Sequence, residues 1–346
     1  MTNSFGDILA IDAPHVVTEI AGAMREQVLN TLHRRGIVVG LSGGVDSSVV
    51  AALAVRALGP QHVFGVLMPD RDSSADSLRL GREWARALGI ETALEDITPA
   101  LDGIGCYRRQ AEAIRTVFPE YGEGYRCKIS LPPLGGGERL NVFRLTVRSP
   151  SGEVRSSRMP AAAYLQLVAA TNFKQRVRMA IEYYHADRLR YAVAGTPNKL
   201  EDDQGFFVKQ GDSDGDLKPI AHLYKTQVYA LAAELGVPEE ICKRTPTTDT
   251  YSMEQTQEEF YFALPYDRMD LCLAARDRGI PAAELAPSAG LTTAQVEQVY
   301  RDIDAKRRAS TYLHAPPLRI VDAPDHADLP AAPRAAAAAG GAVGGA

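Results

Sequence analysis

The chain has 346 residues, of which 45% are hydrophobic and 23% are charged, and its formal net charge is −5. This composition is ordinary for a globular enzyme, and the negative charge gives no electrostatic footprint for nucleic acid. No stretch approaches eighteen uninterrupted apolar residues, and the first twenty residues lack the basic start and apolar run of a signal peptide. We therefore expect a cytoplasmic protein that binds neither nucleic acid nor a membrane.

The first hundred residues alternate predicted helices and strands. A helix is predicted over residues 16–34, because apolar side chains recur at helical spacing and a cationic end precedes Gly36. The strands that follow are expected at 37–41, 62–68 and 90–97, with helices at 49–58 and 75–88. This alternation predicts an α/β fold with a doubly wound parallel sheet, whose ligands bind at the carboxyl ends of the strands.

Residues 103–160 interrupt this alternation. Prolines and glycines at 132–137 predict a loop, and the segments 140–148 and 153–158 flank a Ser-Pro-Ser-Gly turn, a pattern that predicts a β-hairpin. We interpret 103–160 as an insertion in a single domain that covers residues 1–325. Residues 326–346 are Ala, Gly and Pro with almost no bulky side chain, and are predicted to form a disordered tail.

Regular elements resume after the insertion. A long helix is predicted over 161–187 and a strand over 191–194. Further helices are expected at 224–235, 266–278 and 293–308. These elements complete the predicted parallel sheet and its helical layers.

The strongest local signal is the segment Ser42–Ser48, which reads SGGVDSS. A strand that ends in a Ser-Gly-Gly turn and leads into a helix presents unpaired backbone N–H groups at the positive end of the helix dipole, which favours phosphate binding. The segment lacks the Gly-Lys-Ser/Thr of a Walker A loop, so no lysine follows a transferred γ-phosphate. Asp46 is instead well placed to hold Mg²⁺ on a pyrophosphate leaving group. The candidate ATP-binding residues here are Gly40, Ser42, Gly43, Gly44, Val45, Ser47 and Ser48.

A series of motifs follows in the second half of the chain. They are Asn172-x-x-x-Arg176-x-Arg178-Met179, Gly195-Thr196-x-Asn198-x-x-Glu201, the run Gly205–Asp212, Lys225-Thr226-Gln227-Val228, and Pro246-Thr247. Together with the SGGVDS turn, this order resembles the ammonia-dependent NAD⁺ synthetases, whose pattern runs NxxxRxRM, GTxNxxE, GxFTKxGDGxAD, PxxxLxKTQV and PTADL. The resemblance covers about residues 20–100 and 165–280. The turn alone is shared with other ATP pyrophosphatases, such as GMP and asparagine synthetases, and indicates the ATP chemistry without the substrate.

The resemblance implies a reaction. ATP adenylates the carboxylate of nicotinate adenine dinucleotide, pyrophosphate leaves, and ammonia converts the acyl-adenylate to NAD⁺ and AMP. The implied catalytic residues are Asp46, Lys209, Lys225 and Thr247, and the implied Mg²⁺ ligands are Asp46 and Glu201. Arg71, Thr196, Lys225 and Thr247 would also contact ATP, and the dinucleotide would contact Asn172, Arg176, Arg178, Lys209 and Asp212.

The resemblance also implies partners. The family is homodimeric, and its acid substrate binds near the interface that the Asn172–Arg178 helix adjoins. Glutamine-dependent relatives carry a nitrilase-like domain ahead of the SGG turn, where this sequence has only about forty residues. We therefore expect free ammonia, or ammonia from a separate glutaminase, as the nitrogen source.

Three departures from the family pattern leave other functions open. They are the 103–160 insertion, the extra acid Asp214, and the acids Asp202 and Asp203 after Glu201. A paralogous ATP-dependent amide ligase that acts on a different carboxylate is the main alternative. A tRNA- or sulfur-modifying pyrophosphatase would require catalytic cysteines and a basic surface, and the four scattered cysteines and net charge of −5 disfavour it. The acids and lysines at the strand ends disfavour a non-catalytic nucleotide-binding subunit.

Overall fold

The computed structural model describes residues 8–130, 143–212, 214–244, 251–253, 256, 261–262, 264–318 and 320. The chain divides into two units, Met1–Leu313 and His314–Ala346. The predicted tail at 326–346 and the predicted loop at 132–137 lie outside the described residues. Within the described ranges, no helix combines the length and the hydropathy that a bilayer span requires.

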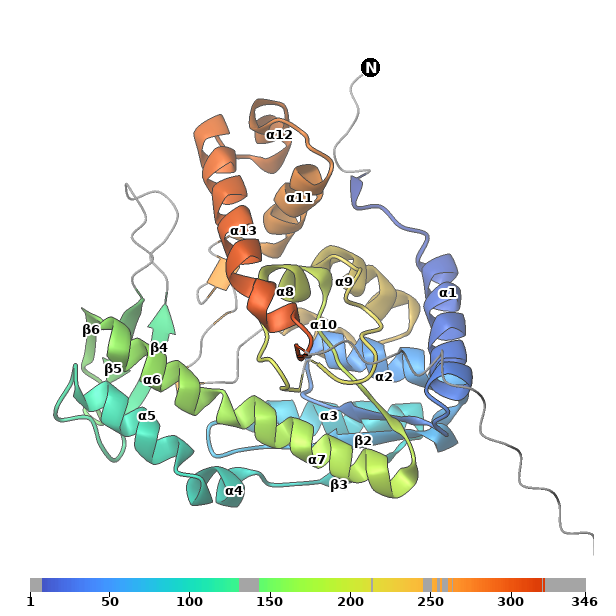
Figure 1. The fold of residues 1–346 in the computed structure, drawn as a ribbon, viewed down its shortest axis with the longest axis horizontal. Helices are drawn as coiled ribbons and strands as arrows, with labels where there is room; N and C mark the ends of the chain where they lie inside the picture. Colours follow the sequence, from blue (N-terminus) through green and yellow to red (C-terminus); the bar gives the residue numbers. More distant parts are fainter. Residues whose placement is uncertain are drawn as a thin grey trace, which may run out of the picture. The chain divides into compact units, whose positions relative to one another are not determined.

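Four parallel strands form the central sheet of the first unit, in the order β3-β2-β1-β7 (Figure 1). The strands are β1 (Ile37–Gly40), β2 (Val63–Leu67), β3 (Glu91–Leu94) and β7 (Ala192–Ala194). Val38 of β1 pairs with Phe64 on one side and with Val193 on the other. Strands β1, β2 and β7 are almost entirely buried, which is why their sequences are continuous apolar runs. The predicted parallel sheet is confirmed.

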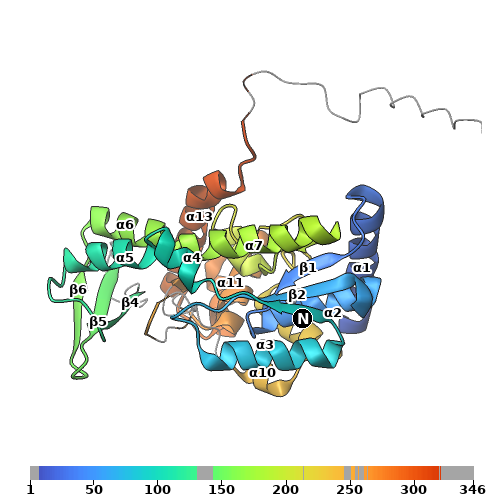
Figure 2. The same cartoon turned by 90° about the horizontal axis from the view of Figure 1, so that it is seen from below.

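Helices cover both faces of this sheet. One face packs against α1 (Ala13–Glu26), α2 (Val45–Leu58), α3 (Ala75–Leu88) and α9 (Lys225–Glu234), in a core that includes Val39, Leu53 and Leu231. The opposite face packs against α4 (Thr98–Gly103), α5 (Cys106–Arg115) and α7 (Phe173–Leu189), around Val38 and Phe64. Figure 2 shows α3 and α7 on opposite sides of the sheet. Because successive side chains of a strand point to opposite faces, Val38 and Val39 belong to different cores, and the doubly wound prediction is confirmed.

Two predicted helices differ in detail from the structure. The helix predicted over 16–34 begins earlier, because Asp12 caps α1 by accepting a hydrogen bond from His15 N at 3.1 Å, and it ends in a π-helical turn over Gln27–Thr31. The helix predicted over 161–187 is two helices, α6 (Ala161–Thr171) and α7. Asn172, with a ψ of −13°, tightens the backbone between them. The helical spacing of apolar residues continues from α6 into α7, so the sequence pattern does not show the break at Asn172.

The insertion folds into a second, antiparallel sheet in the order β4-β5-β6. Its strands are β4 (Arg126–Ser130), β5 (Arg144–Arg148) and β6 (Val154–Arg158). The inner face, with Ile129, Leu145 and Val147, packs against α5 and α6 around Leu167. The predicted hairpin is confirmed as β5–β6, whereas α5 and β4 were not predicted. Helix α6 joins the inserted sheet directly to α7 (Figure 1).

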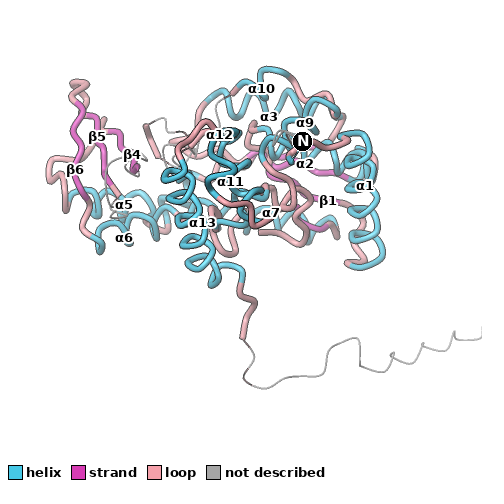
Figure 3. Tube along the Cα trace, turned by 90° about the horizontal axis from the view of Figure 1, so that it is seen from above, coloured by secondary structure: helices cyan, strands magenta, loops and turns pink. Residues whose placement is uncertain are grey.

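Helices after β7 complete the first unit. They are the short α8 (Lys199–Gln204) and α10 (Glu239–Lys243), then α11 (Tyr266–Asp277), α12 (Ala282–Ala289) and α13 (Thr293–His314). The last three share a core around Leu273 and Ile303, and α13 lies beside α11 (Figure 3). Arg276 of α11 pairs with Asp304 of α13 at 2.7 Å, and a Cβ at Gly205, the C-cap of α8, would lie 2.4 Å from Ser310 Cβ. Helix α13 is therefore held against both α8 and α11.

Candidate active site

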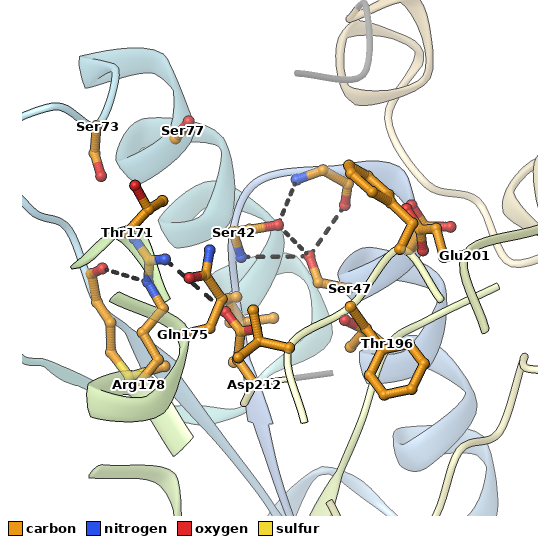
Figure 4. A pocket seen from close by; sticks show the side chains of 18 of the residues that line it. Ser42, Ser47, Ser73, Ser77, Thr171, Gln175, Arg178, Thr196, Glu201 and Asp212 are labelled. Atoms are coloured by element: carbon orange, nitrogen blue, oxygen red, sulfur yellow. Dashed lines mark hydrogen bonds and ion pairs between the residues drawn. The ribbon is translucent and has the colours of Figure 1, made fainter. Parts of the chain in front are cut away.

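A cavity of about 530 Å³ lies at the carboxyl ends of the parallel strands (Figure 4). Its wall includes Gly40 at the end of β1, Met68 after β2 and Thr196 after β7. The chain leaves β1 toward β2 on one side, while β7 pairs with β1 on the other side. Open α/β sheets bind ligands at such a topological switch point, so the cavity lies where the strand pattern predicted it.

The Ser42–Gly44 turn before α2 is ordered by hydrogen bonds that involve the hydroxyl groups of Ser42 and Ser47. Ser47 Oγ donates to Gly44 O at 3.1 Å and lies 3.1 Å from Ser42 Oγ, which accepts from Gly44 N at 3.3 Å (Figure 4). Gly43 has a φ of +72°, and a Cβ there would lie 2.3 Å from Ser77 O, so only glycine fits. The N-cap residue of α2 is Gly44, which has no side chain to accept a hydrogen bond from the first turn. The first-turn N–H groups of α2 are therefore available to an anion.

Asp46, in the first turn of α2, is bonded from two sides. Its Oδ2 pairs with the ammonium group of Lys225, and its Oδ1 accepts from Asn198 Nδ2 at 3.2 Å. Asn198 also caps α8: its Oδ1 accepts from Glu201 N at 3.2 Å, while its own N–H donates to Glu201 Oε2 at 3.2 Å. Asn198 thus connects the two acids predicted to bind magnesium. Asn198 stands in the Gly195–Glu201 motif, and the local signal for its position is the capping box, an Asn followed three residues later by Glu.

Lys225 is fully buried at the start of α9. Burial alone would lower the pKa of this lysine, but the carboxylates of Asp46 and Glu201 more than offset that effect, and the pKa is raised. Lys225 is therefore a fixed cation that lines the cavity beside the Ser-Gly-Gly turn.

One side of the cavity is a face of α6 and α7. Arg178 lies 3.6 Å from Asp70 and 3.9 Å from Asp212, and its Nε donates to Met68 O at 3.4 Å (Figure 4). Lys174, fully buried, pairs with Asp70 at 3.1 Å and Asp72 at 2.7 Å. These ion pairs fasten the loop after β2 to α7 and fix the direction of the Arg178 guanidinium.

The structure brings most of the predicted site residues together. Those that line the cavity are Gly40, Ser42, Gly44, Val45, Asp46, Ser47, Asn172, Arg178, Thr196, Glu201, Asp212 and Lys225. Gly43 and Ser48 support the turn from behind it, and Ser48 Oγ donates to Gly44 O at 2.8 Å. Thr247 lies outside the described residues.

Three other predicted residues are not among those that line the described part of the cavity. Lys209 Nζ donates to the Tyr312 carbonyl oxygen of α13 at 2.9 Å. Arg176 Nε donates to Lys209 O at 3.4 Å. The guanidinium carbon of Arg71 lies 3.4 Å from the centroid of the Tyr107 ring. Their predicted roles in binding and catalysis stay predictions.

Several residues of the wall were not predicted. Gln175 and Glu182 share the cavity-facing side of α7 with Arg178, at the three- and four-residue spacing of a helix face. Arg244, which follows α10, donates to Ser77 Oγ at 2.7 Å and adds a third cation to the wall, after Arg178 and Lys225. The insertion supplies Phe143, whose ring stacks on Tyr164 of α6 with centroids 4.2 Å apart. The insertion therefore contributes to the cavity wall through Phe143, which directly precedes β5.

The acids present suit magnesium that is brought in with a nucleotide. Asp46 and Glu201 both line the cavity. Across the described ranges there is no cluster of three or more His, Cys, Asp or Glu that would hold a metal ion by itself. Mg²⁺ is usually bound through one or two carboxylates together with substrate phosphates, and two carboxylates beside a phosphate-binding turn fit that pattern.

Comparison with known proteins gives consistent similarities. The family model described as NAD synthase matches residues 16–116 and 146–310. An NH(3)-dependent NAD(+) synthetase of Mesorhizobium japonicum is 62% identical over 315 residues, which are 91% of this chain and 99% of the relative. The enzyme of the same name from Rhizobium rhizogenes is 58% identical over 314 residues, covering 91% of this chain and 95% of the relative. The solved structure of NMN synthetase from Francisella tularensis covers 90% of this chain and 99% of its own, with a TM-score of 0.61 and 21% identity, and it supports the fold alone.

Proposed function

The chain belongs to the NAD synthase family, and from this premise we propose that it forms NAD⁺ by ATP-dependent amidation of nicotinate adenine dinucleotide with ammonia. The observation that carries the proposal is the connected group Asp46, Lys225, Asn198 and Glu201 beside the open turn before α2. It combines a phosphate-binding helix end, a fixed cation and two acids suited to magnesium in one cavity.

In the first half-reaction, a carboxylate oxygen of the substrate attacks the α-phosphorus of ATP. The bond from that phosphorus to the bridging oxygen breaks, and pyrophosphate leaves with the electron pair. The hydroxyls of Ser42 and Ser47, the first-turn N–H groups of α2 and the Lys225 ammonium face the departing charge. Preorganised donors of this kind stabilise the transition state because they need no rearrangement as the charge develops.

In the second half-reaction, the nitrogen of ammonia attacks the acyl carbon of the adenylate. AMP leaves with the bonding electron pair, the nitrogen loses one proton to solvent, and the amide is complete. The raised pKa of Lys225 makes it a poor proton acceptor at neutral pH. Its proposed role in both steps is therefore electrostatic.

Magnesium would be held by Asp46 and Glu201 together with the phosphates of ATP. Bound there, the ion would neutralise phosphate charge and favour pyrophosphate as a leaving group. Asp46 already balances Lys225, and Asn198 orients both acids. The acids are thus positioned before any nucleotide binds.

We assign the α6–α7 side of the cavity to the dinucleotide acid. Asn172, Gln175 and Arg178 provide polar contacts there, and Phe143 and Tyr164 provide an aromatic wall. The alternative, a related ligase acting on another carboxylate, is not favoured by the relatives at 62% and 58% identity, both named NH(3)-dependent NAD(+) synthetases.

We also propose a homodimer in the cytoplasm. The family resemblance implies an interface near the Asn172–Arg178 helix, and Leu165 of α6 and Tyr184 of α7, 65% and 63% exposed, are side chains of this region that an interface could cover. A cytoplasmic location gives access to the ATP pool. Light scattering of the purified chain tests the dimer, and a Leu165→Glu variant should be monomeric if α6 lies in the interface.

The decisive experiment measures AMP and NAD⁺ together in the presence of ATP, magnesium, ammonium and the dinucleotide acid. Equal amounts of both products are expected, and Asp46→Ala should abolish both. Asp187→Ala removes an exposed acid of α7 and serves as the matched control. If ATP is cleaved only when another carboxylate is supplied, the dinucleotide assignment is wrong and the alternative ligase is supported. Replacing ammonium by glutamine, with and without a glutaminase, identifies the nitrogen source.

A further inference from the structure

Glu182 is a buried acid in the cavity wall with no role in the reaction as described above. It lies on α7 and is 1% exposed. Its Oε2 is fully buried and has no hydrogen-bond partner among the described residues. A buried carboxyl without a partner is costly to keep in a folded protein. This cost would be offset if a bound ligand supplied the missing partner.

The carboxyl of Glu182 lies over the end of β1. A Cβ built on Gly40 would lie 2.2 Å from Glu182 Oε1, so the glycine makes room for the acid at this point. Gly40 is two residues before Ser42, a separation of at most about 7 Å along the chain. Glu182 therefore borders the part of the cavity next to the phosphate-binding turn.

The cation nearest along α7 does not neutralise Glu182. Arg178 is one helical turn away, but its guanidinium faces Asp70 and Asp212 at 3.6 and 3.9 Å. Burial, and then the charge of Asp212, raise the pKa of Glu182 well above its usual range, and Arg178 offsets this only in part. The protonated form is favoured, and a protonated carboxyl both donates and accepts a hydrogen bond.

We propose that Glu182 hydrogen-bonds a ribose hydroxyl of the nucleotide whose phosphates occupy the Ser42–Ser47 turn, an inference that rests on the proposed function. The sugar is the part of a nucleotide that adjoins the phosphates, whereas the base lies further away. A hydroxyl is also both donor and acceptor, which matches the two oxygens of the acid. Acids near strand ends bind ribose hydroxyls in the same way in other doubly wound folds.

The test is direct binding without turnover. The natural chain and each variant are titrated calorimetrically with ATP, 2′-deoxy-ATP and 3′-deoxy-ATP, in the presence of magnesium and without the second substrate. For each protein, the affinity for ATP is divided by the affinity for each deoxynucleotide. The natural chain should bind one deoxynucleotide roughly tenfold more weakly than ATP, the effect of losing one good hydrogen bond. In Glu182→Ala this ratio should fall to about one, and ATP itself should bind roughly tenfold more weakly. Glu182→Gln, which keeps a donor and an acceptor, should retain part of the discrimination.

Two controls separate the possible failures. Asp187→Ala, on the exposed side of the same helix, should keep the ratios of the natural chain. Thermal unfolding shows whether each variant is folded. The role of Glu182 would be overturned if the ratio of ATP affinity to deoxynucleotide affinity were the same in the natural chain and in folded Glu182→Ala. It would also be overturned if the natural chain bound ATP and both deoxynucleotides equally well. Absence of ATP binding by the natural chain would instead overturn the proposed function.

Discussion

Lys225 and Asp46 form a buried ion pair that joins the first turn of α9 to the first turn of α2, although 179 residues separate them along the chain. A lysine at a helix N-terminus is unfavourable with respect to the helix dipole, and it is also fully buried here. Asp46 compensates for both effects. The pair therefore keeps a cation in a position where it is useful to phosphates and costly to the fold.

Replacing Lys225 by methionine should separate catalysis from stability. The change leaves Asp46 without its cation, so the free energy of unfolding should fall by about 3 kcal/mol, as when a buried pair loses one partner. The rate of AMP formation should fall at least 100-fold, as when a transition-state donor is removed. Urea unfolding and single-turnover kinetics measure the two effects. The double variant Asp46→Asn/Lys225→Met has no unpaired buried charge, so its stability should recover while its activity should not. A double variant as unstable as Lys225→Met would contradict the role assigned to the ion pair.

Removing the amide of Asn198 should weaken magnesium binding. Asn198→Ala deletes the side-chain hydrogen bond to Asp46 and the cap of α8, whereas the backbone N–H of residue 198 can still donate to the Glu201 carboxylate. We expect the magnesium concentration for half-maximal activity to rise several-fold, together with a loss of about 1 kcal/mol in stability from the missing cap. The exposed Asn30, which bonds Glu26 at 2.6 Å, provides the control Asn30→Ala. An unchanged magnesium dependence would show that Asn198 only caps the helix.

A methyl group at Gly40 should interfere with Glu182. Gly40→Ala places a Cβ 2.2 Å from Glu182 Oε1, and such overpacking costs about 1–3 kcal/mol. Glu182→Ala in the same chain should relieve the clash, so the two substitutions should not be additive in urea unfolding. Among the described residues, no atom outside the backbone of α1 lies within 4 Å of a Cβ added at Gly22, and Gly22→Ala should slightly stabilise the protein. If the two substitutions changed the free energy of unfolding additively, the Glu182 carboxyl would not lie against Gly40 in solution.

The aromatic wall from the insertion should affect one substrate more than the other. Phe143→Ala or Tyr164→Ala removes a ring from the α6 side of the cavity, which we assign to the dinucleotide acid. The KM for the dinucleotide acid should rise roughly fivefold while the affinity for ATP stays the same, because a stacked ring contributes about 1 kcal/mol. Tyr125→Ala removes an aromatic ring of the insertion that is not among those lining the cavity, and should leave both constants unchanged. If only the dissociation constant for ATP rose, ATP rather than the dinucleotide acid would bind against the α6 side of the cavity.

Local patterns predicted the parts of this site that local structure determines. The SGGVDSS turn, its strand and its helix are contiguous, so their geometry follows from glycine conformations and helix-end donors, and the β5–β6 hairpin follows from alternation around a turn. Asn198 and Glu182 differ, because their importance depends on partners far along the chain. Asn198 meets Asp46 across 152 residues, and Glu182 is defined by its position over Gly40.

Helix packing accounts for the remaining differences. The direction of α7 decides that Glu182 and Gln175 face the cavity, whereas Arg176 points toward the backbone of Lys209. The packing of α13 places the Tyr312 carbonyl where it accepts from Lys209. A sequence motif gives the order and spacing of these residues. The direction in which each side chain points depends on how the whole helix packs against its neighbours.

Asp270 of α11 should make stability depend on pH. It is fully buried, and its Oδ2 accepts from Thr226 N, beside Lys225, at 2.7 Å. Burial, offset in part by this hydrogen bond, raises its pKa from 3.8 to about 6. Between these two values the folded state holds a proton that the unfolded state has released, so stability must fall as pH rises through this window.

Relative to Asp270→Asn, the natural chain should lose about 2 kcal/mol of unfolding free energy between pH 4 and pH 7, because each pKa unit corresponds to about 1.4 kcal/mol and part of the loss falls below pH 4. Urea unfolding of both proteins at intervals across this range measures the difference. Asp187→Asn, at an exposed position of α7, should run parallel to the natural chain. A difference that is constant with pH, or that grows in favour of the natural chain, would mean that Asp270 is ionised throughout, held in that state by the Lys225 ammonium.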